Sequence, residues 1–135
     1  MQARLQSVPV SVNAPLVGRI VSGMAALFLA IDGVVKLATP EPVVRAMDEL
    51  GYPDRMAVGI GALLLACLAV YLYPRTSALG AVLLTGYLGG AIASQVRIEA
   101  DLFPVVFPAI VGTLIWTGLY LRDARLRALL APRGE

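Results

Sequence analysis

The chain contains no histidine and only one cysteine among its 135 residues. Histidine is the commonest metal ligand in proteins and the side chain that titrates near neutral pH. Its absence excludes a histidine-ligated haem or metal site and any acid–base relay built on imidazole. The lone Cys67 leaves no internal disulfide, no CxxC redox pair and no multi-cysteine metal centre.

Charged residues are also scarce. They make up 15% of the sequence, hydrophobic residues make up 59%, and the mean hydropathy is +0.80. The net charge is only +2, and the basic residues are scattered, so the chain lacks the concentrated basic surface that a phosphate backbone requires. We therefore expect a lipid bilayer as the first partner and no nucleic acid.

Four long apolar segments account for the hydropathy. A helix needs roughly 20 mostly apolar residues to cross the hydrocarbon of a bilayer, and segments 16–37, 55–73, 76–96 and 103–121 meet that requirement. They are too long for buried strands and lack the alternation of a membrane barrel strand. The sequence predicts an all-α fold, an integral membrane four-helix bundle, with residues 1–135 forming a single domain.

The basic residues predict the orientation. The apolar run of segment 16–37 is longer than the apolar core of a signal peptide and has no clear small-residue cleavage site, so we expect this span to be retained. The side of both termini then carries Arg4, Arg19, Arg75, Arg122, Arg125, Arg127 and Arg133. The other side carries Lys36, Arg45, Arg55 and Arg97 among several acids. Because cytoplasmic loops are enriched in Lys and Arg, we place both termini in the cytoplasm and the protein in the cell (inner) membrane.

Two short amphipathic helices are expected at the membrane surface. After the first span, Thr39 is a candidate N-cap, Pro40 suits the first helical position and Gly51 can end the helix. One face of this helix carries Val43, Val44, Met47 and Leu50. In the C-terminal tail we expect the arginines to face lipid head groups and the leucines to face lipid. These leucines are Leu121, Leu126, Leu129 and Leu130.

Small residues form the clearest packing surface. Gly86, Gly90 and Ser94 follow one another at i+4 spacing in segment 76–96. Segment 55–73 offers Ala62, Ala66 and Ala69 as a matching face. Because lipid tails are as apolar as Leu, helix association in a membrane depends on close backbone approach and polar contacts. We expect these faces to pack together within one chain, with a dimer interface as the alternative.

The candidate functional site rests on polar residues inside the apolar segments. Asp32 lies five residues before Leu37, about 7–8 Å deep at 1.5 Å per residue, and Lys36 is its i,i+4 neighbour. Tyr87, near the middle of its span, needs a partner or a cavity for its hydroxyl. Gln95 and Arg97 end the same span. Ionisable residues inside a membrane are functional candidates by default.

Two interpretations of these residues stay open. In the first, Asp32 and Lys36 neutralise each other and orient the first span. In the second, the candidate ligand-binding residues Asp32, Lys36, Tyr87, Gln95 and Arg97 line a polar pocket. The sequence shows no nucleophile–base pair, carboxylate dyad or glycine-rich phosphate loop, so the catalytic residues stay unknown.

Three stretches carry a family resemblance. They are "FLAIDGVVKLATPEPVVRAMDELGYP", "YLYPRTSALGAVLLTGYLGGAIASQVR" and "LIWTGLYLRDARLRALL". Together, over about 17–130, they resemble the DoxX-like family of small bacterial integral membrane proteins. The order and spacing of the Leu-Gly-Tyr-Pro, Pro-Arg-Thr and Gly-Tyr-Leu-Gly-Gly-Ala pieces make the resemblance specific.

The resemblance implies a function linked to redox chemistry. Relatives are associated with the membrane subunit of thiosulfate:quinone oxidoreductase and with complexes that handle thiols and oxidants. Quinone is thus the implied cofactor, and a redox-partner protein or a homo-oligomer the implied partner. Relatives often carry Glu near the position of Leu64 and His at that of Gln95. Since these groups are missing, a non-catalytic scaffold or assembly factor is the alternative. A transporter is a weaker third option, because four short helices without an inverted repeat leave little room for alternating access.

Overall fold

A computed structural model describes residues 13–132 and 134. This part of the chain contains helices and no strand, so the all-α prediction is confirmed for it. The helices are α1 (Ala14–Ala38), α2 (Glu41–Leu50), α3 (Met56–Leu72), α4 (Ser77–Arg97), α5 (Leu102–Arg122) and α6 (Ala124–Leu130). The first twelve residues, including Arg4, and Arg133 lie outside the described residues.

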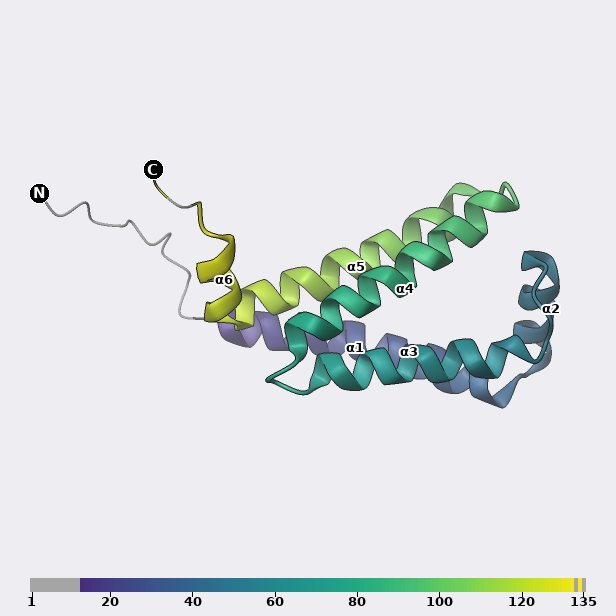
Figure 1. Cartoon of the computed structure of the whole chain (residues 1–135), viewed down its shortest axis with the longest axis horizontal. Helices are drawn as coiled ribbons and strands as arrows, with labels where there is room; N and C mark the ends of the chain where they lie inside the picture. The colour runs from purple at the N-terminus through teal and green to yellow at the C-terminus, as the bar shows by residue number, and fades with distance from the viewer. Residues whose placement is uncertain (1–12, 133, 135) are drawn as a thin grey trace, which may run out of the picture.

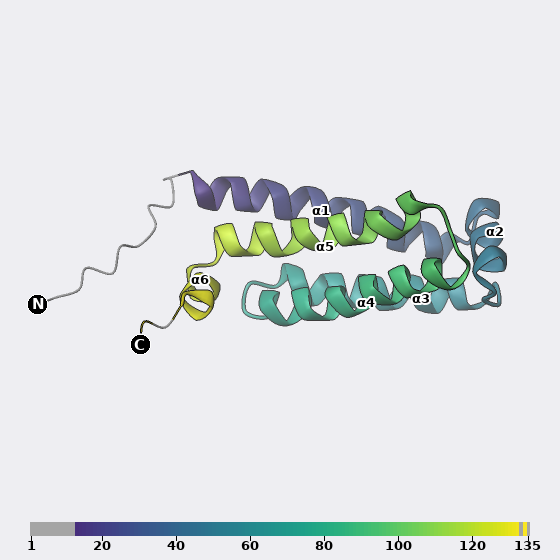
Figure 2. The ribbon, with the colours of Figure 1, turned by 90° about the horizontal axis from the view of Figure 1, so that it is seen from above.

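The four long helices coincide with the four apolar segments. Helix α1 packs against α3 and α5, and α4 packs against the same two helices. Figure 1 shows that the α1–α3 pair and the α4–α5 pair lie close together near α6 and diverge toward α2. In both views α6 and the start of α1 lie at one end of the molecule and α2 lies at the other (Figures 1 and 2). By length and composition α1, α4 and α5 can each cross a membrane, whereas α3, with 17 residues, is a shorter apolar helix.

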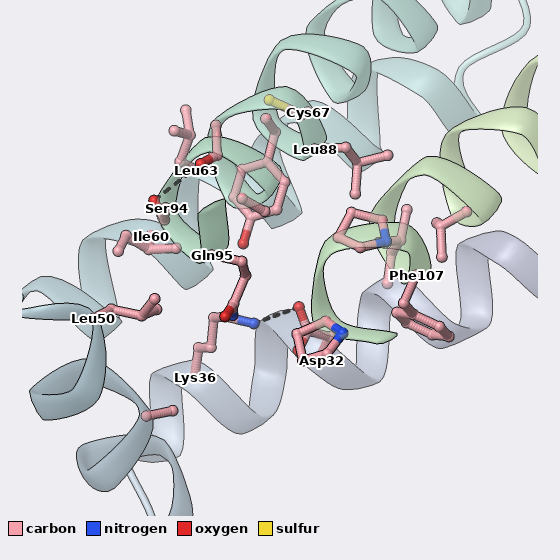
Figure 3. A pocket seen from close by; sticks show the side chains of 18 of the residues that line it. Asp32, Lys36, Leu50, Ile60, Leu63, Cys67, Leu88, Ser94, Gln95 and Phe107 are labelled. Atoms are coloured by element: carbon pink, nitrogen blue, oxygen red, sulfur yellow. Dashed lines mark hydrogen bonds and ion pairs between the residues drawn. The ribbon is translucent and has the colours of Figure 1, made fainter. Parts of the chain in front are cut away.

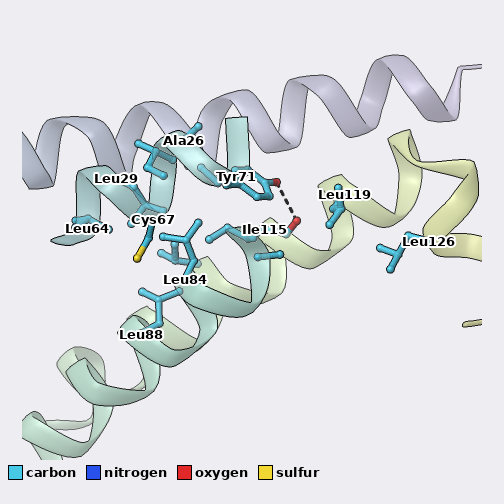
Figure 4. Packing of buried hydrophobic residues seen from close by; sticks show 14 residues of the cluster. Ala26, Leu29, Leu64, Cys67, Tyr71, Leu84, Leu88, Ile115, Leu119 and Leu126 are labelled. Atoms are coloured by element: carbon cyan, nitrogen blue, oxygen red, sulfur yellow. Dashed lines mark hydrogen bonds between the residues drawn. The ribbon is translucent and has the colours of Figure 1, made fainter. Parts of the chain in front are cut away.

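The hydrophobic core concentrates where the two pairs meet. Its largest fully buried side chains are Tyr71, Leu29, Leu64, Leu84, Ile115 and Leu119 (Figure 4). The Tyr71 hydroxyl donates toward Ser22 Oγ, at 2.9 Å, and toward the Ile115 carbonyl oxygen, at 3.1 Å. Arg122 Nε donates to the same Ser22 Oγ at 3.1 Å, and its guanidinium lies 5.2 Å from the centre of the Tyr71 ring. These contacts tie α1, α3 and α5 together at one end.

Glycines allow the closest helix approaches. A Cβ atom at Gly80 would lie 2.2 Å from the backbone N and Cα of Tyr71, so α4 touches the backbone of α3 directly. A Cβ at Gly118 would lie 2.8 Å from the backbone N of Ser22, and one at Gly61 would lie 2.8 Å from the Gly33 carbonyl oxygen. Each of these three contacts therefore depends on the missing side chain.

The predicted packing face of α4, formed by Gly86, Gly90 and Ser94, makes no such close contact with α3. A Cβ at Gly86 or Gly90 would meet no atom within 4 Å, and Ser94 hydrogen-bonds to the Gly90 carbonyl oxygen at 2.9 Å. On α3, the matching residues Ala62, Ala66 and Ala69 are all exposed. The intramolecular packing prediction was wrong because α4 turns this face toward the gap where it diverges from α3. The dimer alternative stays a prediction.

Helix α2 has the amphipathic character expected of it. Met47 is buried, Val43, Val44 and Leu50 are half-buried, and the charged face is exposed. Gly51 ends the helix at φ +74°, as predicted. Thr39 is not the N-cap, however. It adopts φ +49° as the C-cap of α1, and Pro40 occupies the N-cap position of α2, because the chain turns from α1 into α2 within two residues.

Helix α6 folds back onto the core. Asp123 caps it by accepting a hydrogen bond from the Arg125 backbone N at 2.9 Å. Leu126 is buried in the core and Leu121 is half-buried, so only Leu129 and Leu130 are exposed as predicted. Arg127 donates to the carbonyl oxygens of Tyr120 and Leu121 at 2.8 and 2.7 Å. It therefore closes the end of α5 instead of facing head groups, because the short turn at Asp123 brings it there.

We expect Gly80→Ala to destabilise the protein and Gly86→Ala to leave it unchanged or slightly more stable. The added methyl at position 80 collides with the Tyr71 backbone, and such overpacking costs about 1–3 kcal/mol. At position 86 it meets open space, and Ala favours a helix over Gly by about 1 kcal/mol. Thermal unfolding in detergent measures the stability of both variants. Equal melting temperatures of Gly80→Ala and Gly86→Ala would contradict the close contact at Gly80.

Candidate functional site

The divergence of the helix pairs leaves a cavity of about 710 Å³. This volume lies within the range of about 300–1,000 Å³ that small-molecule sites occupy. The end of the cavity nearest the core is apolar and is lined by Leu29, Cys67, Leu88, Phe107 and Val111. The end nearest α2 is more polar and is lined by Asp32, Lys36, Tyr52, Ser94 and Gln95 (Figure 3). The cavity is thus amphipathic along its length.

Asp32 and Lys36 form the ion pair that their spacing predicts. Lys36 Nζ donates to the Asp32 carboxylate across one turn of α1, and both side chains line the cavity (Figure 3). The Lys36 side chain is 18% exposed and that of Asp32 is 35% exposed. The pair therefore places two opposite charges, with no net charge, at the polar end of the cavity.

Tyr87 and Gln95 extend the polar lining from α4. Both side chains are half-buried and line the cavity. The sequence predicted that the Tyr87 hydroxyl needs either a hydrogen-bond partner or a cavity, and its side chain lies at a cavity. Leu64 is fully buried in the hydrophobic core. The structure thus brings together four of the five predicted site residues, Asp32, Lys36, Tyr87 and Gln95.

Arg97, the fifth predicted residue, does not line the cavity. Its guanidinium donates to the Leu50 carbonyl oxygen and lies 5.9 Å from the centre of the Tyr52 ring. The Tyr52 hydroxyl in turn lies 3.0 Å from Ser94 Oγ. We call Arg97, Tyr52, Ser94 and Leu50 the α2 clasp, because they hold the end of α2 against the end of α4. Arg97 lies outside the cavity because its guanidinium donates instead to the carbonyl oxygen of Leu50, the last residue of α2.

Sequence reasoning also missed an aromatic cluster beside the cavity. The rings of Phe28 on α1 and Phe107 on α5 meet edge to face, with centres 5.1 Å apart, and Phe103 lies 5.4 Å from Phe107. All three line the cavity. The i+4 spacing of Phe103 and Phe107 was a visible signal for a shared face, but nothing local indicated that Phe28 would meet them.

A second, shallower groove of about 450 Å³ lies between α4 and α5. Small residues line most of it, among them Gly89, Ala109 and Gly112. At one end Trp116 Nε1 donates to Thr85 Oγ1 at 2.7 Å. This groove holds none of the predicted ligand-binding residues.

Long apolar helices around an amphipathic cavity define a helical membrane protein. The DoxX-like family matches residues 20–118, which is most of the chain. The chain belongs to the DoxX-like family. It matches no curated protein and no solved structure significantly.

We expect Arg97→Met to loosen α2 without unfolding the protein. The substitution removes the hydrogen bond to the Leu50 carbonyl and the contact with the Tyr52 ring, so local opening of α2 becomes more frequent. Hydrogen exchange of the α2 amides should accelerate several-fold, while the melting temperature stays within a few degrees. Arg125→Met, an exposed arginine on α6, is the matched control. Unchanged exchange in α2 would show that the clasp does not hold it.

Proposed function

We propose that this protein is a four-span membrane protein that binds a small amphipathic molecule and serves a quinone- or thiol-linked redox system as a membrane subunit or accessory. The observation that carries the proposal is the cavity, which has an apolar end near Cys67 and Val111 and the Asp32–Lys36 pair at its other end. An amphipathic ligand presents the same two kinds of surface. The family resemblance supplies the redox context.

The proposal includes α3 as the fourth span. Its 17 residues extend about 26 Å at 1.5 Å per residue, slightly less than the hydrocarbon thickness of about 30 Å. It packs beside α1 and α4, which are long enough to span. Arg55 precedes it and Tyr73 follows it, and both residue types suit the membrane interface.

We further propose that both termini lie in the cytoplasm of a bacterial inner membrane. The end of the molecule near α6 carries five described arginines, Arg19, Arg75, Arg122, Arg125 and Arg127, whereas the opposite end carries the four basic residues Lys36, Arg45, Arg55 and Arg97. Excess Lys and Arg mark cytoplasmic loops.

A quinone suits the chemistry of the cavity. Its carbonyl oxygens accept hydrogen bonds, and Lys36 and Gln95 supply donors at the polar end. Its ring and tail are apolar, as is the lining at Leu29 and Leu88. In this proposal a partner protein oxidises or reduces the ligand, and this chain binds and positions it.

The orientation is tested with fusions to the C-terminus. We expect a fused green fluorescent protein to be fluorescent and a fused alkaline phosphatase to be inactive in a bacterial host, because the first folds in the cytoplasm and the second needs the periplasm. The same pair inserted after Asp54, between α2 and α3, should give the opposite pattern. An active phosphatase at the C-terminus would reverse the proposed topology.

Ligand binding is tested with a decyl-benzoquinone titrated into the purified protein in lipid nanodiscs. We expect saturable binding that weakens about tenfold in Lys36→Met, since loss of a hydrogen bond from a charged donor costs roughly 1.5–3 kcal/mol. Asp32→Asn should also alter the affinity, because it frees Lys36 from its partner.

The matched control for this titration is Arg45→Met. Arg45 forms the other i,i+4 ion pair, with Glu41, but the pair is exposed and outside the cavity. Its loss should leave binding unchanged. Absence of saturable binding, or equal affinities for the wild type, Lys36→Met and Asp32→Asn, would refute the proposed site.

The second candidate function is a non-catalytic scaffold or assembly factor. The groove between α4 and α5 favours it, because small residues such as Gly89 and Gly112 allow a partner helix to approach closely. Native electrophoresis of solubilised membranes should then show a complex of fixed stoichiometry that Gly112→Leu disrupts. A solitary monomer in both samples would count against this function.

A further inference from the structure

The polar end of the cavity is covered on its aqueous side. Ala46, Met47 and Leu50 of α2 line the cavity there, and Met47 is 4% exposed. Through Arg97 and Tyr52, the α2 clasp holds α2 against the end of α4. Helix α2 therefore lies between the cavity and the water beyond it.

The side between α1 and α5 is bridged by aromatic side chains. The edge-to-face contact of Phe28 with Phe107 bridges the two helices at the level of the cavity. Phe103 packs against the same ring of Phe107. A ligand would have to displace this aromatic cluster to pass between α1 and α5.

The side between α3 and α4 is different. Gly86 and Gly90 line the cavity and are exposed, and a Cβ at either position would meet nothing within 4 Å. Across from them on α3, Leu63 lines the cavity while 57% exposed. Exposed glycines that line the cavity, with no atom within 4 Å of an added Cβ, mark an opening that no side chain of theirs fills. Gly86 and Gly90 lie away from both ends of α4 (Ser77–Arg97). With α4 as a membrane span, this opening therefore lies within the hydrocarbon layer.

We propose that the opening between α3 and α4 at Gly86 and Gly90 is a lateral portal, and that the ligand is a lipid with a long hydrocarbon chain that passes through it. This inference rests on the proposed ligand binding. The head group, a hydrogen-bond acceptor, lies near Lys36, and the chain leaves between α3 and α4 into the bilayer.

The physical basis is the cost of moving the chain. Lipid tails are as apolar as the cavity wall, so a chain gains little by folding into the cavity and loses conformational freedom if it does. A chain that remains in the bilayer avoids that loss. The cavity then contacts only the head group and the first part of the chain. Chains of any greater length bind as well, because the remainder stays in the bilayer.

The test compares two probes in nanodiscs: a benzoquinone with a decyl tail and the same ring without a tail. The variant Gly86→Leu/Gly90→Leu fills the portal with side chains at positions that have free space. The matched control is Gly89→Leu, which also has free space but lies in the groove between α4 and α5. Thermal unfolding checks that each variant is folded, and the single variant Gly90→Leu replaces the double variant if that one does not fold.

We expect the double variant to weaken binding of the tailed probe about tenfold or more relative to wild type, with less than about a threefold change for the tailless probe. Gly89→Leu should change neither. Equal effects on the two probes, or no effect on either, would overturn the portal while leaving the proposed function intact. If the wild type binds neither probe, the proposed function fails and the portal fails with it.

Discussion

Where α4 begins, its backbone lies directly against the backbone of α3. The contact is possible because Gly80 has no side chain, and a Cβ there would lie 2.2 Å from Tyr71. Tyr71 is itself held by Ser22 and by the Ile115 carbonyl, so α1, α3, α4 and α5 converge within one small region. From this region the α1–α3 and α4–α5 pairs diverge toward α2 (Figure 1). The cavity is the space that this divergence leaves.

The polar groups of the structure fall into two sets at opposite ends of the long helices. Near α6, Ser22, Tyr71 and Arg122 satisfy one another and hold the helices together. Near α2, Asp32 and Lys36 satisfy each other within one helix and leave the space between the helices free. This difference matters in a bilayer, where apolar burial does little to drive helices together and interhelical polar contacts do more. Contacts among three helices hold one end together, and the cavity lies toward the other end.

Patterns along single helices predicted much of this molecule. The four apolar segments became the four long helices, α2 buries the predicted apolar face at Met47, and the i,i+4 spacing of Asp32 and Lys36 produced the ion pair. The failures involve contacts between helices. Gly86 and Gly90 have the spacing of a packing face, but Gly80 makes the close contact with α3. Arg97 has the charge and position of a site residue, but the Leu50 carbonyl holds it elsewhere.

Composition and periodicity suffice for the all-helical membrane class and for the pairing of Asp32 with Lys36, because each depends on residues within one helix or on the chain as a whole. The DoxX-like family is recognised from the resemblance of several motifs along the chain. The cavity, the α2 clasp and the Phe28–Phe107 contact depend on where separate helices meet. A rotation of α4 about its axis would move Gly86 away from the cavity with no change in hydropathy. That rotation is set by the three-dimensional packing of Gly80 on Tyr71, which joins residues of two different helices.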